Sequence, residues 1–399
     1  MESVALSLAI IIILGLVFTK GFEKIKMPGF FGMLILGILI GPYCFNLISS
    51  NLMNISPDIR ILTLIIILLR AGFGINKDSI HNVGLSVVKM SFIPSLLEGL
   101  TIMAVGHLLL GIPLLESAML GFIVAAVSPA VIVPQMLSFI DKKIGTSKGI
   151  PNLILASAAL DDVIVIAVFT AIMGIYGGSS INIAGEILSI PISIVLGAVI
   201  GFIVALVTLT IFRKFDIHNT EKALLVLAFA IILKNIGDFS TPIIPLAGLV
   251  GVMVLSFVIM DRRSDLGVPL SHTFNKIWIF AEILVFVLVG SQVNLLLVWN
   301  YTLIGILVLL IGLAARSAGV YISLMGTEFN LKEKLFCVVS FIPKATVQAT
   351  IGAIPLAAGV ASGELILAIA VLSILFTSPL GALAVRYVGK SAFGVEEVK

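Results

Sequence analysis

Two adjacent carboxylates stand inside a long apolar run of the 399-residue chain. Asp161 and Asp162 occur in the segment LILASAALDDVIVIAVF, which holds no other charge. An ionised side chain at the centre of a bilayer costs about 2.5–3.5 kcal/mol on insertion scales, so such residues face a bundle interior or a water-filled cavity. A carboxylate in a wet cavity binds a proton or a hard cation, because both compete for the same oxygens. The pair therefore predicts a site for cations and protons.

The two aspartates are expected to have different surroundings. Neighbouring helix positions point about 100° apart, so the two side chains cannot face each other. We expect one of them to meet a fixed cation and the other to face an aqueous cavity. The alternative is that both form salt bridges for helix packing, and it carries more weight for Asp161 than for Asp162.

Three further charges lie deep in apolar runs, namely Glu98, Arg316 and Lys344. Each needs a counter-ion at that depth. We expect Asp161 to pair with Arg316, and Glu98 with Lys344. The exchanged pairing stays open, as does a role for Lys344 in capping the carbonyls of a broken helix.

Prolines interrupt two apolar runs in a polar setting. Pro129 and Pro134 bracket one short run, and Pro343 precedes Lys344 in another. Each proline removes a backbone N–H and frees carbonyls, which are tolerated at membrane depth only where they line protein or water. Together with the hydroxyls of Ser128 and Ser157, such carbonyls supply the oxygens that suit Na⁺, by analogy with other hard cations. A plain proline kink is the alternative.

The composition makes the bilayer the solvent for these runs. Hydrophobic residues make up 60% of the chain and charged residues 11%, against about 25% charged in an ordinary soluble domain. This excludes a soluble enzyme, a disordered chain and a nucleic-acid binder, and the net charge of +3 indicates no polyanionic partner.

A spanning helix needs about 20 mostly apolar residues. That length predicts an all-α polytopic membrane protein, in contact with lipid and without a soluble domain. Its thirteen expected spans are 3–19, 29–47, 59–74, 83–110, 115–139, 151–176, 183–212, 220–236, 241–260, 276–297, 301–325, 332–354 and 364–387.

The basic residues predict how these spans are oriented. Of the 24 Lys and Arg, four lie deep inside spans, and nearly all the others lie in the loops that follow odd-numbered spans or at the span ends that border those loops; Arg60 and Lys234 are the exceptions. Cytoplasmic loops carry an excess of Lys and Arg. We therefore expect a cell (inner) membrane protein with its N-terminus outside and its C-terminus in the cytoplasm. The first apolar run follows Glu2 rather than a basic segment, which favours a retained helix over a signal peptide.

The spans also show weak internal symmetry. Spans 1–6 can be laid over spans 8–13, with the seventh as the connector. The fifth span of each half carries the proline interruption, and the fourth carries a charge, Glu98 in one half and Arg316 in the other. The odd offset gives the halves opposite orientations, which is the pattern of inverted repeats with broken helices near the midplane.

Four motifs together resemble the sodium/proton antiporters of the cation/proton antiporter superfamily, in particular the NHA type. They are VSPAVIVP, ALDD, LLRAGFGIN and FIPKATVQATIG. The resemblance implies that Asp162 binds the cation and the proton, that Asp161 pairs with Arg316, and that Glu98 and Lys344 form a second charged pair. It also implies a homodimer in which core helices, here about 83–176 and 301–387, move against dimerisation helices, here about 1–74 and 183–297.

One residue departs from many electrogenic relatives, which have lysine where Arg316 stands. A buried lysine can lose its proton, whereas arginine effectively cannot. This departure puts in doubt a second proton carried at this position and favours one proton per cation.

The expected function is exchange of Na⁺ or Li⁺ for H⁺ by alternating access, without a cofactor and without catalytic residues. A K⁺/H⁺ exchanger or a cation channel using the same carboxylates is the main alternative, and a bile-acid-type solute carrier is another. An intramembrane aspartyl protease needs two carboxylates on different helices sharing one proton, which adjacent aspartates on one helix do not provide.

Overall fold

The computed structural model describes residues 3–25, 27–74, 84–177, 183–215, 218–240 and 246–393, and within these ranges every regular element is a helix. Eight of these helices are long and apolar enough to cross a bilayer. The chain is therefore an all-helical, multi-span membrane protein; the count of thirteen spans stays a prediction. The helices are α1 (Val4–Lys24), α2 (Gly29–Ile40), α3 (Ser50–Gly74), α5 (Leu85–Leu110), α6 (Leu114–Ala125), α7 (Pro129–Asp141), α8 (Ile150–Tyr176), α9 (Ile183–Lys214), α10 (Asn219–Ser240), α11 (Gly248–Arg262), α12 (Ser264–Ser291), α13 (Leu295–Ser323), α14 (Leu331–Ser340), α15 (Thr346–Ile351), α16 (Ile354–Ala357) and α17 (Gly363–Phe393).

Contacts divide the chain into two compact units. Unit 1 comprises Met1–Pro57, Asp78–Val165 and Ile283–Lys399, and unit 2 comprises Asp58–Lys77 and Ile166–Glu282. Every residue predicted for the ion site belongs to unit 1. Unit 1 also takes in Met1–Pro57, which the resemblance assigns to the dimerisation helices; the division into core and scaffold stays a prediction.

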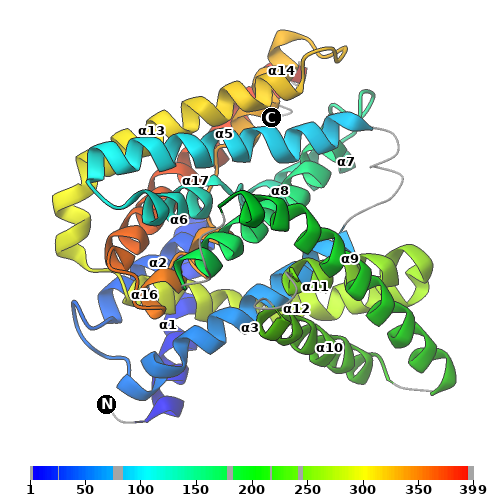
Figure 1. Ribbon diagram of the computed structural model, residues 1–399, viewed down its shortest axis with the longest axis horizontal. Coiled ribbons are helices and arrows are strands. Elements are labelled where there is room, and N and C mark those ends of the chain that lie inside the picture. The colour runs from blue at the N-terminus through cyan, green and yellow to red at the C-terminus, as the bar shows by residue number, and fades with distance from the viewer. Residues whose placement is uncertain are drawn as a thin grey trace. The chain divides into compact units, whose positions relative to one another are not determined.

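Within unit 1, α5 is packed closely between α6 and α13, and Figure 1 shows α5 in cyan running alongside α13 in yellow. Glycines allow these approaches. A Cβ on Gly121 of α6 would lie 2.3 Å from the carbonyl oxygen of Gly99, and one on Gly319 of α13 would lie 2.7 Å from the Cα of Pro94. Real Cβ atoms do not approach that closely, so larger side chains at these positions would push the helices apart. The close packing brings Glu98 on α5 next to Arg316 on α13.

Two of the expected spans in unit 1, those at 115–139 and 332–354, are broken by non-helical segments. One break separates Ala125 at the end of α6 from Pro129 at the start of α7, and the other separates Ser340 at the end of α14 from Thr346 at the start of α15. Pro343 and Lys344 lie in the second break. The backbone N–H of Ser128 donates to the carbonyl oxygen of Pro343 at 2.8 Å, which joins the two breaks.

The two prolines of the first run therefore act differently. Pro129 is the first residue of α7, where a missing N–H costs nothing because no intrahelical partner exists there. Pro134, expected to bound the interruption on its other side, lies within α7, and the helix continues to Asp141. The interruption is therefore on the N-terminal side of Pro129 alone.

An apolar cluster joins α7, α14 and α17. The ring of Phe336 lies 5.4 Å from that of Phe139 and 5.0 Å from that of Phe393, edge to face in both cases. Phe336 is fully buried. These contacts hold the three helices against one another.

Unit 2 contains α9, α10 and α11 packed against one another, with the second part of α3 and the first part of α12. The backbones of α9 and α11 meet where a Cβ on Gly201 would lie 2.3 Å from the carbonyl oxygen of Gly251. The span expected at 276–297 was misplaced, because α12 begins at Ser264 and ends at Ser291. Its first turns are polar, and a count of apolar residues misses them; Asp265 nonetheless favours a helix start through the helix dipole.

Candidate functional site

Asp161 on α8 is held by two donors. Its Oδ2 accepts from Nη2 of Arg316 at 3.0 Å and from the backbone N–H of Val127 at 2.9 Å. The side chain is fully buried. Asp161 is thus bound both to α13 and to the non-helical link between α6 and α7.

Asp162, the next residue, has no such partner. Its side chain is 4% exposed, and among the described residues it forms no ion pair or hydrogen bond; the buried Oδ1 lacks a donor. The two carboxylates therefore differ as their angular separation on the helix predicts. Of the two carboxylates, Asp162 is therefore the one without a partner among the described residues.

Arg316, Glu98 and Lys344 form one network rather than two separate pairs. Oε2 of Glu98 accepts from Nη1 of Arg316 at 2.8 Å and from Nζ of Lys344 at 2.6 Å. Both predicted pairings are present, and the contact between Glu98 and Arg316 joins them. The guanidinium can serve both Glu98 and Asp161 because it carries five N–H donors in a fixed fork. All these side chains are at most 1% exposed, so they act as a single buried group of charges.

The second break holds Lys344 through its backbone. Its N–H donates to Oγ1 of Thr377 at 2.9 Å, and its carbonyl accepts from the hydroxyl of Ser378. Both partners lie on α17. The side-chain ammonium of Lys344 donates to Glu98. The carbonyls at the end of α6 accept instead from Gln348 and Arg316.

Buried oxygens without donors surround the breaks. They are Oδ1 of Asp161, Oδ1 of Asp162, Oγ of Ser128, Oγ1 of Thr346 and Oε1 of Gln348. A buried polar atom without a partner is costly, and a bound ion or water removes that cost. Carboxylate, hydroxyl and amide oxygens are the ligands that hard cations prefer. These oxygens are therefore of the chemical type that suits Na⁺.

The predicted oxygen ligands are thus only partly free. Ser128 leaves its hydroxyl without a partner, in keeping with the prediction. The hydroxyl of Ser157 instead donates to the carbonyl of Val87 on α5 at 3.4 Å. Thr346 and Gln348 were missed, although both are polar side chains in an apolar run directly after Pro343, which is a signal that sequence analysis can use.

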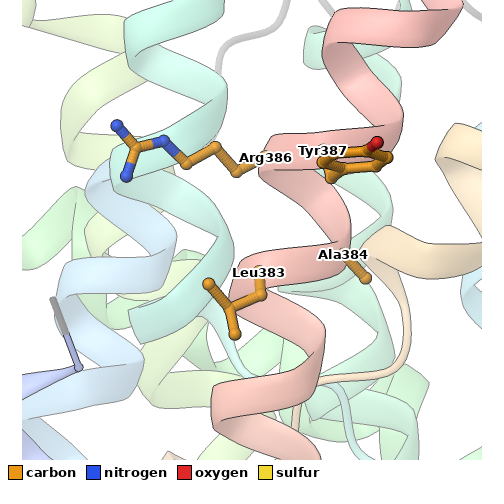
Figure 2. Close-up of a pocket in the computed structure, with 4 residues that line it drawn as sticks. All are labelled: Leu383, Ala384, Arg386 and Tyr387. Atoms are coloured by element: carbon orange, nitrogen blue, oxygen red, sulfur yellow. The ribbon is translucent and has the colours of Figure 1, made fainter.

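Three cavities of unit 1 are lined by residues outside this network. One, of about 340 Å³, is lined by Leu383, Ala384, Arg386 and Tyr387 on α17, and Figure 2 shows Arg386 and Tyr387 leaving the helix on opposite sides. It contains no carboxylate. Its aromatic and basic side chains are typical of the membrane interface, so it is not a candidate for the ion site.

Comparison with known proteins gives a family match over most of the chain. The sequence pattern of the family described as "Sodium/hydrogen exchanger, transmembrane" matches residues 8–389. Sodium/hydrogen exchanger 9B2 of Homo sapiens is 30% identical over 382 residues, covering 91% of this chain and 69% of that protein. Sodium/hydrogen exchanger 9B1 of Macaca fascicularis is 31% identical over 379 residues, covering 91% of this chain and 72% of that protein.

Solved structures give the same fold. The structure of the sodium proton antiporter MjNhaP1 from Methanocaldococcus jannaschii at pH 8 superimposes with a TM-score of 0.84 and 23% sequence identity, covering 97% of this chain and 98% of that chain. At this identity the likeness shows the fold alone.

Glu98 pairs with both Arg316 and Lys344, so its replacement is expected to lower the stability of the protein. We expect Glu98→Gln to destabilise the protein by about 3–5 kcal/mol, because it leaves the buried Arg316 and Lys344 with a single carboxylate between them. Thermal unfolding of the purified protein in detergent measures the effect as a lowered melting temperature.

The control is Asp265→Asn, the same acid-to-amide change in a carboxylate that pairs with Arg263 at 2.7 Å, where both side chains are exposed. Such exposed pairs contribute about 0–1 kcal/mol. Equal melting temperatures for the two variants would contradict the buried network.

Proposed function

Because the chain belongs to the sodium/hydrogen exchanger family, we propose that it is a secondary antiporter in which Na⁺ or Li⁺ competes with H⁺ for Asp162. The family consists of transporters, so covalent chemistry is not expected, and the proposal includes no cofactor. Binding of either ion neutralises the carboxylate. The neutral site crosses the membrane barrier at lower cost than the charged one.

The observation that carries this proposal is the unequal pairing of two neighbouring carboxylates. Asp161 is engaged by Arg316 at 3.0 Å, whereas the side chain of Asp162 has no donor among the described residues. If both served only helix packing, both would need a cation. A buried carboxylate left without one is expected where a mobile ion supplies the charge.

The charge of the buried group supports one-for-one exchange. Glu98, Asp161 and Asp162 against Arg316 and Lys344 leave one unbalanced negative charge when all are ionised. One Na⁺ or one H⁺ balances it. Since arginine does not release its proton, a second proton would have to come from a group already engaged in an ion pair.

The proposal includes an arrangement in the membrane. Thirteen spans form two inverted repeats. The helices at about 83–176 and 301–387 carry the charged group as an elevator-like core, and those at about 1–74 and 183–297 form the scaffold of a homodimer. The N-terminus lies outside and the C-terminus in the cytoplasm of a cell (inner) membrane. The distribution of Lys and Arg and the two proline breaks support this arrangement.

Replacing Asp162 tests the proposed function. We expect Asp162→Asn to reduce Na⁺- and Li⁺-driven proton flux in reconstituted vesicles to the level of protein-free vesicles, because an amide offers neither a titratable proton nor a charge for the cation. Fluorescence of a trapped pH dye measures the flux, with Na⁺, Li⁺ and K⁺ added in turn.

Asp265→Asn is the matched control, because Asp265 pairs with Arg263 at 2.7 Å in an exposed position; it should keep wild-type flux. Wild-type flux in Asp162→Asn would refute the proposal. A wild-type response to K⁺ equal to that for Na⁺ would indicate a K⁺/H⁺ exchanger, and cation flux without proton counter-flux would indicate a channel.

A voltage clamp tests the one-for-one exchange. We expect the initial rate of ²²Na⁺ uptake against a fixed pH gradient to be the same at zero potential and at an imposed inside-negative potential, because equal charges move in both directions. Valinomycin with set K⁺ gradients imposes the potential. A rate that changes steadily with potential would show that more than one proton moves per Na⁺.

A further inference from the structure

The end of α6 presents backbone carbonyls inside the membrane-embedded unit. The last four carbonyls of a helix have no intrahelical partner. At α6 the chain turns extended at Ala126, and residues 123–127 are essentially buried. Without water these groups must find donors in the protein. The donors that they find connect this helix end to the charged group.

The side-chain amide of Gln348 donates to several of these carbonyls, its two N–H groups being shared among three oxygens. Its Nε2 lies 3.0 Å from the carbonyl oxygen of Ile123, 3.3 Å from that of Val124 and 2.8 Å from that of Ala126. The side chain is fully buried and comes from α15, directly after the second break. One amide thus ties the end of α6 to the start of α15.

Arg316 takes the remaining carbonyl. Its Nη1, which also contacts Glu98, meets the carbonyl oxygen of Ala125. The neighbouring N–H of Val127 donates to Asp161. The same short stretch of backbone is therefore bound by Gln348 and by both members of the Arg316–Asp161 pair, and a shift of this stretch would change the orientation of both.

We propose that Gln348 is a positioning residue for cation exchange. By holding the end of α6, it sets where Arg316 and Asp161 lie, and so leaves Asp162 as the one carboxylate free for the cation. This inference rests on the proposed function. Gln348 need not touch the cation for this role, since it acts through the backbone that it holds.

A neutral amide suits this position for an electrostatic reason. It donates through two N–H groups without adding charge. A lysine or arginine here would balance the negative charge that attracts Na⁺. A carboxylate would face carbonyl oxygens with no proton to donate unless it were protonated, and a leucine would fill the space without any donor.

Three variants test the proposal by Na⁺-dependent proton flux in vesicles over a series of pH values. Gln348→Leu keeps the volume and removes the donors; we expect the apparent KM for Na⁺ to rise by about tenfold, because buried carbonyls lose their partners, with a smaller change in maximal rate. Gln348→Glu should work at acidic pH, where the introduced carboxyl is protonated and donates, and lose activity as the pH rises, so that its pH profile is displaced to the acid side of wild type.

Thr350→Val is the matched control. Thr350 is equally buried on α15, but its hydroxyl bonds only within its own helix, to the carbonyl oxygens of Thr346 at 2.9 Å and Val347 at 3.0 Å. This variant should keep both the KM and the pH profile of wild type. A purely structural role of hydrogen bonds in α15 would move all three variants together.

A wild-type KM in Gln348→Leu would overturn the proposal. If Gln348→Leu does not fold, the pH profile of Gln348→Glu decides, and a profile matching wild type overturns it. Absence of cation-driven proton flux in the wild-type protein would refute the proposed function and this inference with it, whereas normal wild-type exchange with unaffected Gln348 variants would refute this inference alone.

Discussion

One unbalanced negative charge in a buried centre is the constraint on which the structure depends. Glu98, Asp161 and Asp162 are essentially buried, and among the described residues Arg316 and Lys344 are the cations that oppose them. Burying ions is costly unless they are paired and hydrogen-bonded with good geometry. The fold meets this requirement for four of the five groups by alternating their charges, with Glu98 between Lys344 and Arg316 and Arg316 between Glu98 and Asp161. Asp162 is left over, and in the proposed function its charge is the one that a cation or a proton balances.

The broken helices serve the same electrostatic arrangement. An unbroken α6–α7 would satisfy its own backbone and offer nothing to Arg316, Asp161 or Gln348. The break exposes carbonyls and an N–H that these three side chains bind. The backbone hydrogen bond from Ser128 to Pro343 joins the first break to the second. Lys344 lies in the second break, and its ammonium donates to Glu98. Backbone and charges are therefore held by one set of contacts, as expected where irregular backbone occurs at membrane depth.

The cost of burying a charge made part of this site predictable from sequence. Asp161, Asp162 and Arg316 stand out because nothing else explains ionisable residues in apolar runs. That Glu98 lies between Arg316 and Lys344 was not predictable, because the geometry of a guanidinium fork relative to two helices is a property of packing. Gln348 gave a weaker signal, since a neutral amide is cheaper to bury than a charge.

The fold shows the same limits. Apolar length located the helices, but it placed α12 twelve residues late because its first turns, from Ser264, are polar.

Counting protons released on Na⁺ binding tests the central claim most directly. Purified wild-type protein in detergent is titrated with NaCl in a weakly buffered solution, and the pH change is compared with the amount of Na⁺ bound. Competition at one carboxylate predicts that proton release per Na⁺ rises to about one, and no higher, as the starting pH is lowered. Na⁺ binding with no proton release at any pH, or with two protons released, would contradict the account.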